Sequence, residues 1–285
     1  MRKTKIEWCD YTWNPVTGCH HGCDYCYARR ISRRFCTNEH GKQGLMSPCA
    51  GDCNACSIMD GYEFLGEKIR YNHGKAPYPY GFMPTFHSHR LDEPAKLKNP
   101  SSIFVCSMGD LFGEWVPDKW IKEVLTACAT TPWHSYLFLT KNPDRYYQLD
   151  DRDSNILPDV TVPDEEFGGW YLGASASAEE EAQKAYENMC ISWMSLEPLH
   201  GNFSEEFFFY QDSISDTEPR WNWLVVGTET GNRKNKIIPK EEWIEDIIDN
   251  CKLYDIPLFM KDSLIPIIGE ENMKREFPVG MKRRK

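Results

Sequence analysis

From about residue 100 onward, short apolar runs alternate with stretches in which apolar residues recur at helical spacing. The apolar runs predict strands at Ile103–Cys106, Ser135–Leu139, Trp170–Ala174, Ile191–Ser195, Trp223–Val226 and Pro257–Met260. These runs are nearly continuous rather than alternating, which is typical of parallel strands buried on both faces. A further strand is expected near the N-terminus, at Thr4–Trp8.

The stretches between these strands predict helices at Pro117–Ala129, Ala178–Met189 and Lys240–Leu253. Strand–helix alternation at this spacing implies βαβ units. An acidic loop at 150–169 and an insertion at 202–220, which contains a short aromatic helix, interrupt the pattern. We therefore expect an α/β fold, a partial or nearly closed (β/α) TIM-type barrel that forms a single domain over residues 1–285.

Polar or glycine residues follow most of the expected strands. They are Ser107, Gly109, Asp110, Thr140, Lys141, Ser175, Ser177, Glu197, Gly227, Thr228 and Glu229. In a (β/α) barrel the C-terminal strand ends form the active face, so this placement predicts a binding site. At any single position, the helix caps and turns that βα loops require explain such residues equally well. Polar or glycine residues after several strands in succession favour a site.

The composition fits a globular protein, with 41% hydrophobic and 13% aromatic residues. A net charge of −10 argues against indiscriminate binding to nucleic acid. The basic residues nevertheless gather at Arg29, Arg30, Arg33 and Arg34 and at the C-terminal 282–285. They form either a solvated helix face and a frayed tail, or a basic rim around a site that accepts an anionic substrate.

The chain contains no apolar stretch of roughly 18 residues or more, so no membrane span is expected. The first 13 residues include basic side chains without an apolar run behind them, which is unlike a signal peptide. We therefore expect a cytoplasmic protein. Disulfides are rare in that compartment, so its 12 cysteines are not expected to form a disulfide framework.

Seven cysteines fall between residues 19 and 56, a density that indicates metal binding. Cys106, Cys128, Cys190 and Cys251 lie in apolar surroundings and are expected in the core, whereas the role of Cys9 is open.

Cys19, Cys23 and Cys26 place three thiolates in one loop. Closed 4Fe–4S clusters usually take four cysteines, so three ligands leave one iron open, and an open iron can chelate S-adenosylmethionine (SAM). Tyr25, just before the last cysteine, suits packing against a cofactor. A zinc site completed by His20 or His21 is the alternative.

The Cys-x3-Cys-x2-Cys spacing, with an aromatic residue before the last cysteine, resembles the radical-SAM signature. The surrounding sequence resembles a phage- and bacterium-borne family of unknown function that is often encoded beside three-Cys-motif partner proteins. The resembling stretches are Thr4–Trp8, Thr12–Cys19, Cys26–Ala28, His89–Pro94, Ile103–Val105, Ser107–Phe112, Leu139–Lys141, Ser195–Leu199 and Val225–Gly231. The resemblance implies a radical-SAM barrel that uses SAM and an external electron donor. Residues 36–80, with their extra cysteines, depart from the family's pattern and are expected to be a cysteine-rich insertion.

By this resemblance, Ser107, Gly109 and Asp110 are expected where radical-SAM enzymes hold the SAM amino group. Lys141, Ser175 and Ser177 would face its ribose or carboxylate. Glu197 and the turn Gly227–Gly231, which includes Glu229, would face ribose and adenine.

Within the insertion, Cys49, Cys53 and Cys56 repeat the spacing of the first motif, and Cys36 is a plausible fourth thiolate. Four thiolates predict a closed site, either a second 4Fe–4S cluster or a structural zinc. The opposing interpretation leaves these cysteines without a metal.

The leading functional hypothesis is a radical-SAM enzyme whose substrate is a nucleic acid, another phosphorylated molecule, or a peptide or partner protein. Its rival is a non-enzymatic, zinc-stabilised nucleic-acid-binding or adaptor module. A metal hydrolase would need clustered Asp and His ligands, and Asp110 and Glu229 have no His neighbours in the sequence.

Overall fold

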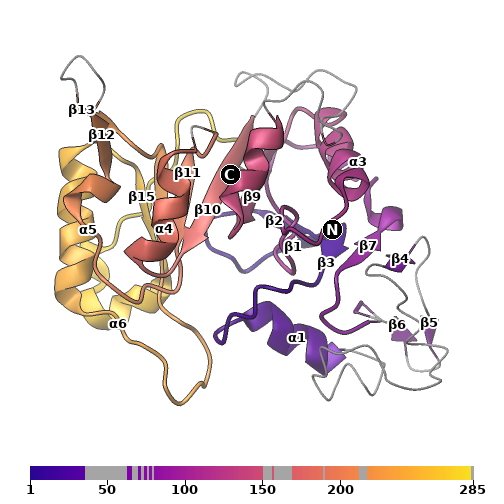
Figure 1. The fold of residues 1–285 in the computed structure, drawn as a ribbon, viewed down its shortest axis with the longest axis horizontal. Helices are drawn as coiled ribbons and strands as arrows, with labels where there is room; N and C mark the ends of the chain where they lie inside the picture. Colours follow the sequence, from indigo (N-terminus) through magenta and orange to yellow (C-terminus); the bar gives the residue numbers. More distant parts are fainter. Residues whose placement is uncertain are drawn as a thin grey trace.

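The structure is a computed structural model that describes residues 1–35, 77–78, 80–149, 156, 169–188, 190–211 and 217–283, together with the backbone of 63–65, 70–71 and 74–75. Its main element is an eight-stranded sheet in the order β1-β2-β8-β9-β10-β11-β14-β15 (Figure 1). Cys36, Cys49, Cys53 and Cys56 lie outside the described residues, so their metal site stays a prediction.

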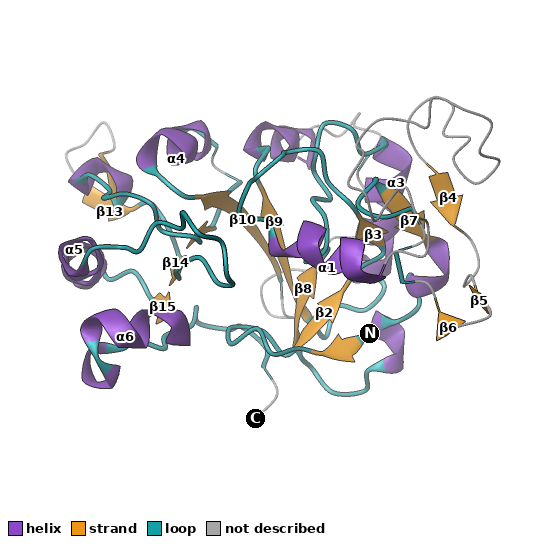
Figure 2. Cartoon of the chain, turned by 90° about the horizontal axis from the view of Figure 1, so that it is seen from below, coloured by secondary structure: helices purple, strands orange, loops and turns teal. Residues whose placement is uncertain are grey.

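Seven strands of this sheet run parallel to one another. They are β2 (Tyr11–Trp13), β8 (Ser102–Val105), β9 (Ser135–Thr140), β10 (Trp170–Ala176), β11 (Trp193–Leu196), β14 (Trp223–Val226) and β15 (Leu258–Met260). The short β1 (Arg2–Lys3) pairs with β2 in the antiparallel direction. The sheet curls into a half barrel (Figure 2), which confirms the expected α/β fold with a partial barrel.

The helices between the strands lie around the outside of this curl (Figure 2). They are α3 (Asp118–Ala129), α4 (Glu179–Tyr186) and α5 (Glu241–Leu253), and α6 (Ile265–Ile268) follows the last strand. Helix α3 shows why they pack there, because Ile121, Val124, Leu125 and Cys128 recur at helical spacing and are fully buried. These side chains join one large core cluster with the outward-facing residues of the strands.

A second core cluster fills the inner side of the half barrel. Phe104 belongs to it, whereas its neighbours Ile103 and Val105 belong to the outer cluster, as the alternation of side chains along a strand requires. Trp8 packs on Phe104 with ring centroids 4.7 Å apart. The C-terminal tail also contributes, since Phe277 lies 5.0 Å from Phe259 between ring centroids. The inner side is therefore packed with aromatic side chains from both ends of the chain.

The strand expected at Thr4–Trp8 is wrong. The first parallel strand is β2 at Tyr11–Trp13, and the backbone N–H of Thr4 donates to the carbonyl of Asp10 at 3.1 Å, which closes a turn between β1 and β2. Trp8 lies in this turn and points into the inner core, 2% exposed. Its apolar character reflects burial in a turn rather than a place in the sheet.

Smaller elements surround the half barrel. The remaining strands are β3 (Val16–Thr17), β4 (Glu63–Leu65), β5 (Arg70–Tyr71), β6 (Gly74–Lys75), β7 (Thr85–His87), β12 (Phe209–Gln211) and β13 (Thr217–Pro219). Helix α1 (Tyr27–Phe35) follows the cysteine loop. The 3-10 helices are Ser88–Arg90, Pro94–Lys96, Pro143–Leu149, Glu205–Phe207, Asp262–Leu264 and Glu270–Asn272.

The insertion at 202–220 contains the expected short aromatic helix, as the 3-10 turn Glu205–Phe207, followed by the β12–β13 hairpin. Cys106, Cys128 and Cys251 are buried in the core, as expected, and Cys190 is half-buried against it. Cys9 is buried in the inner cluster.

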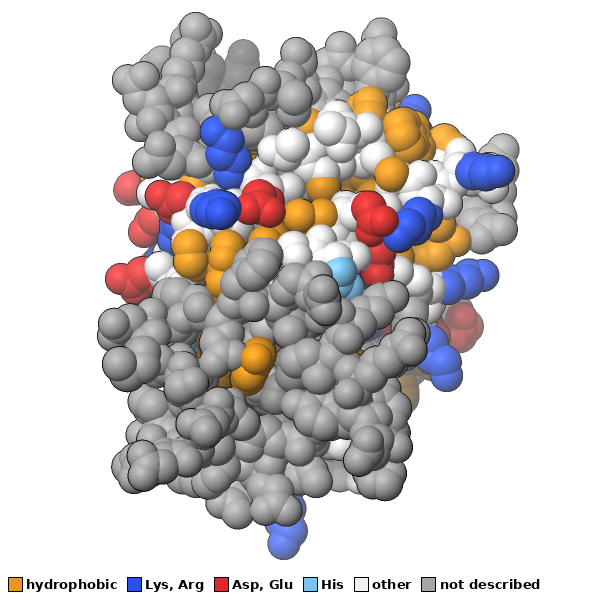
Figure 3. All heavy atoms as spheres, turned by 90° about the vertical axis from the view of Figure 1, so that its right-hand side faces the viewer, with side chains coloured by type: hydrophobic (Ala, Val, Ile, Leu, Met, Phe, Trp, Pro, Cys, Tyr) orange, Lys and Arg blue, Asp and Glu red, His pale blue; other side chains and the backbone are white. Residues whose placement is uncertain are grey.

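On the face shown in Figure 3, described acidic and basic side chains lie among one another. Among the described residues, no helix has both the length and the apolar character needed to cross a membrane.

Candidate functional site

A pocket of about 500 Å³ lies at the C-terminal ends of the parallel strands. Its volume falls in the range of small-molecule and cofactor sites. The predicted site residues that line it are Cys19, Cys23, Cys26, Ser107, Gly109, Asp110, Lys141, Ser175, Glu197 and Glu229. Ser177 and Gly227 are not part of its lining. The structure therefore brings most of the residues expected at the strand ends into one cavity.

The cysteine loop is seated directly on the end of β8. Gly18 makes a parallel bridge with Gly109, and its N–H donates to the carbonyl of Met108 at 2.9 Å. Gly18 has a φ of +89°, and a Cβ there would lie 2.2 Å from the Met83 carbonyl oxygen. Only glycine fits this left-handed, crowded position, which starts the turn toward Cys19.

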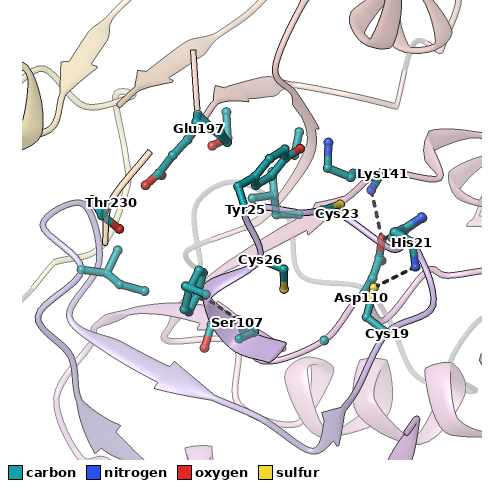
Figure 4. Close-up of a pocket in the computed structure, with 18 of the residues that line it drawn as sticks. Cys19, His21, Cys23, Tyr25, Cys26, Ser107, Asp110, Lys141, Glu197 and Thr230 are labelled. Atoms are coloured by element: carbon teal, nitrogen blue, oxygen red, sulfur yellow. Dashed lines mark hydrogen bonds and ion pairs between the residues drawn. The ribbon is translucent and has the colours of Figure 1, made fainter. Parts of the chain in front are cut away.

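The three cysteines of the loop are partly exposed, form no disulfide and face a shared space in the pocket (Figure 4). Burial raises the pKa of Cys19 and of Cys26. Backbone N–H groups point at both sulfurs, from His21 to Cys19 Sγ and from Arg29 to Cys26 Sγ, each at 3.4 Å. Donors aimed at sulfur stabilise the thiolate, which is the form that binds metal.

His21 ties the cysteine loop to Asp110. Its Nε2 lies 2.7 Å from Asp110 Oδ2, and the same oxygen accepts from Thr140 Oγ1 and the backbone N–H of Lys141, each at 3.0 Å. Asp110 Oδ1 accepts from the N–H of Phe112 at 3.0 Å. The sequence shows no His near Asp110, but the fold brings His21, 89 positions away, into contact with it.

Tyr25 and Lys141 belong to a hydrogen-bonded chain on one wall of the pocket. Tyr25 Oη and Ser177 Oγ lie 2.8 Å apart, and the Ser177 N–H donates to Glu181 Oε2 at 2.8 Å. Lys141 Nζ donates to the same Glu181 oxygen at 3.0 Å and lies 5.8 Å from the Tyr25 ring centroid. Burial opposes the ionisation of Glu181, but the Lys141 ammonium and the hydrogen bonds from Ser177 together outweigh burial and lower the pKa of this carboxyl. Ser177 therefore does not line the pocket, but it holds Tyr25 in place through a hydrogen bond.

The opposite wall carries two ion pairs. Lys261 Nζ donates to Glu197 Oε1, and both side chains line the pocket. Arg233 donates to both carboxylate oxygens of Glu229, at 2.8 and 2.7 Å, and these bonds lower the pKa of Glu229. Lys261 was not predicted, although it directly follows the last expected strand.

Two further residues fix the loop after β8. Asn14 Oδ1 accepts from the backbone N–H of Met108 at 2.8 Å and from Ser107 Oγ at 3.2 Å. Tyr27 reaches in from α1, and its hydroxyl donates to the carbonyl of Ser107 at 2.6 Å. Asn14 lies in the resembling stretch Thr12–Cys19, so a signal for it existed. Tyr27 likewise lies in a resembling stretch, Cys26–Ala28, but its contact with Ser107 could not be read from the sequence.

The sequence matches the family described as "Protein of unknown function (DUF5131)" over residues 3–264. The chain belongs to this family. No curated protein matches the sequence. The expected membership of a family of unknown function is confirmed.

Among solved structures, the chain is similar to a cysteine-to-alanine mutant of spore photoproduct lyase with dinucleoside spore photoproduct, at 10% identity and a TM-score of 0.47. A cysteine-to-serine mutant of the same lyase gives 11% identity and a TM-score of 0.46. Each match covers 91% of this chain and 78% of the other chain.

Proposed function

We propose that this protein is a radical-SAM enzyme that binds a 4Fe–4S cluster through Cys19, Cys23 and Cys26. The observation that carries the proposal is the placement of these three cysteines. They stand on one loop at the C-terminal ends of a parallel half barrel and face the pocket that the other strand ends line. Active sites of (β/α) barrels are built at this end.

The donor set fits a cluster better than a single ion. In the described part of the chain, no three His, Cys, Asp or Glu side chains come close enough together to hold one metal ion. Around a zinc ion, sulfurs at about 2.3 Å from the metal would have to crowd together. A four-iron cluster is larger, so its thiolates surround a shared space, and Cys19, Cys23 and Cys26 lie around the pocket in Figure 4. This favours the cluster over the zinc-stabilised module.

When bound, the cluster supplies the electron that splits the sulfonium of SAM into methionine and a 5′-deoxyadenosyl radical. The residues of the chain hold and shield the reactants. Asp110 Oδ1 accepts one hydrogen bond, from Phe112, and so retains acceptor capacity toward the ammonium of SAM. Lys141 lies beside Tyr25 on the wall proposed for the SAM carboxylate or ribose. Glu197 and Lys261 offer an acceptor and donors on the wall proposed for ribose and adenine.

The apolar wall of the pocket serves the same chemistry. Trp8, Phe104 and Leu139 line its inner side, and Trp8 and Phe104 are 2% and 7% exposed. An aliphatic and aromatic wall excludes water from the space around a reactive radical. The proposed reaction also needs an external one-electron donor.

Anaerobic reconstitution with iron and sulfide, followed by absorption and EPR spectra, tests the cluster. Alanine at Cys19, Cys23 or Cys26 should abolish the signal of this cluster, whereas alanine at Cys190, which does not line the pocket, should leave it unchanged. A colourless protein with about one zinc and no iron would contradict the proposal and support the zinc module.

Metal analysis of the same preparation tests the proposed second site at Cys36, Cys49, Cys53 and Cys56. About eight irons indicate two clusters, and about four irons with one zinc indicate a structural zinc. About four irons without zinc, unchanged when Cys53 is replaced by alanine, would contradict a metal in this segment.

A further inference from the structure

Four of the nine residues of helix α1 are arginines, and none is acidic. Arg30, Arg33 and Arg34 are exposed, and Arg29 is half-buried. The same helix buries Ala28 and Ser32 and presents Tyr27, Ala28 and Ile31 to the pocket. One helix thus combines a pocket wall with a strongly basic surface.

On helix α1, basic and aromatic side chains lie on the same helix faces as the residues that line the pocket. Residues three and four positions apart share a helix face, so Arg34 and Phe35 extend the face of Ile31 away from the pocket. Arg30 extends the face of Tyr27 in the same way. Phe35 is 50% exposed and Tyr27 is 42% exposed, although the Tyr27 hydroxyl is anchored on Ser107. A track of cations and exposed rings therefore leads out of the cavity.

The loop after β14 lies against this track. Arg30 Nη2 donates to the carbonyl of Thr230 at 3.0 Å, and Thr230 lines the pocket. Figure 1 shows the segment that follows β14 running beside the N-terminal end of α1. It adds two exposed cations, Lys234 and Lys236. It also exposes two aliphatic side chains, Ile237 at 42% and Ile238 at 65%.

Carboxylates do little to neutralise this surface. Glu229 is held by Arg233, so that pair adds no net charge. Asp24 is exposed and is the remaining carboxylate among residues 18–35 and 227–240. The chain as a whole carries a net charge of −10, and on the face of Figure 3 charges of both signs are mixed. A single-sign cluster at the mouth of the cavity is thus a local departure from the overall charge.

We infer that this basic rim, formed by Arg30, Arg33, Arg34, Lys234 and Lys236 with the rings of Tyr27 and Phe35, binds single-stranded nucleic acid and presents a nucleotide to the pocket. Guanidinium and ammonium groups neutralise phosphates, and exposed aromatic rings stack on unpaired bases. That a nucleotide is then the substrate rests on the function proposed above, whereas binding at the rim does not.

The single-stranded form follows from the shape of the site. A cavity of about 500 Å³ that also holds the proposed cofactor is too small to admit a duplex. Bases inside a duplex are also out of reach of a cavity unless they are flipped out, which costs unstacking energy. An acidic peptide would satisfy the cations but would leave the aromatic rings without stacking partners.

Fluorescence anisotropy with the full chain and a labelled single-stranded oligonucleotide of about 12 nucleotides tests this inference. The measurement needs neither SAM nor a reductant, so it stands even if the radical chemistry fails. The test variant is Arg33→Gln/Arg34→Gln. The matched control, Lys119→Gln/Lys252→Gln, removes two exposed cations from α3 and α5 on the outer side of the barrel.

The expected result is that the rim variant binds about tenfold more weakly than wild type and the control binds like wild type. The slope of log affinity against log salt should become shallower by roughly 0.7 for each phosphate that the variant no longer neutralises. Tyr27→Leu should weaken binding with no change in that slope. Equal binding by the rim and control variants would overturn the inference, as would equal or tighter binding of a duplex or a polyglutamate peptide.

Discussion

His21 Nε2 lies 2.7 Å from Asp110 Oδ2, so the loop that carries the three cysteines is held by a carboxylate from the turn after β8. Asp110 is 5% exposed, and the same oxygen accepts from the hydroxyl of Thr140 and the N–H of Lys141 at the end of β9. One buried carboxylate thus connects the cysteine loop to two strand ends. We therefore expect the position of the cysteine loop to depend on this carboxylate.

Asp110→Asn should therefore destabilise the fold as well as the site. In asparagine an amide nitrogen, which is a donor, replaces one of the two carboxylate oxygens. The buried groups that donate to that oxygen would then have no acceptor. We expect a loss of about 2–4 kcal/mol in the free energy of unfolding, measured with urea, and lower iron content after reconstitution. Asp249→Asn, at an exposed carboxylate on α5, is the control. Unchanged stability and iron content with weaker SAM binding would assign the carboxylate to the ligand alone.

Gly18→Ala separates steric crowding from backbone strain. Gly18 and Gly280 both have positive φ, at +89° and +85°, but a Cβ at Gly280 would meet no atom within 4 Å. A Cβ at Gly18 would strike the backbone of Met83. Gly280→Ala should cost about 1 kcal/mol, and Gly18→Ala should cost more and displace the cysteine loop. Thermal unfolding measures the loss of stability, and iron content after reconstitution reports on the cysteine loop. Equal melting temperatures and iron contents for the two variants would contradict the close packing of Gly18 against Met83.

His87 should make the protein sensitive to acid. Burial, together with the nearby Arg90 charge, lowers the pKa of His87 to about 2, and its ring is 0% exposed. A depressed pKa means that the unfolded chain takes up the proton first, so stability is fully present above about pH 6.5 and falls as the pH drops toward 2. The expected slope for this group is about 1.4 kcal/mol per pH unit.

His87→Gln, which can keep the hydrogen bond to Thr17, tests this account. Urea unfolding between about pH 7 and pH 5 should show a steeper loss of stability in wild type than in the variant. Parallel curves for the two proteins, whatever their offset, would show that His87 does not contribute to acid sensitivity.

The sequence predicted the later strands well because most of their residues are apolar and several of the strands are buried on both faces. Trp193–Leu196 and Trp223–Val226 are fully buried in this way. The same rule failed near Trp8, because a buried turn is as apolar as a buried strand. The β12–β13 hairpin was missed because Phe209–Gln211 is half-buried or exposed and lacks that signal.

Positions at the strand ends were also predictable, because a parallel barrel brings these ends to one side. Their partners were not. His21 and Asp110 are 89 positions apart, and Arg30 and Thr230 are 200 positions apart. Such contacts depend on how the cysteine loop and α1 fold back over the strand ends, and no local pattern encodes that. Lys261 could have been found by applying the strand-end rule to the last strand as well.

We propose that the chain cleaves SAM at a cluster held by Cys19, Cys23 and Cys26. The most direct measurement is the amount of 5′-deoxyadenosine formed from SAM by reduced, reconstituted protein. Wild type should form 5′-deoxyadenosine and methionine, and the variant with alanine at all three cysteines should form neither, while alanine at Cys190 should leave the yield unchanged. Equal 5′-deoxyadenosine from wild type and the triple variant, or none from a wild-type protein whose cluster is present and reducible, would contradict the account.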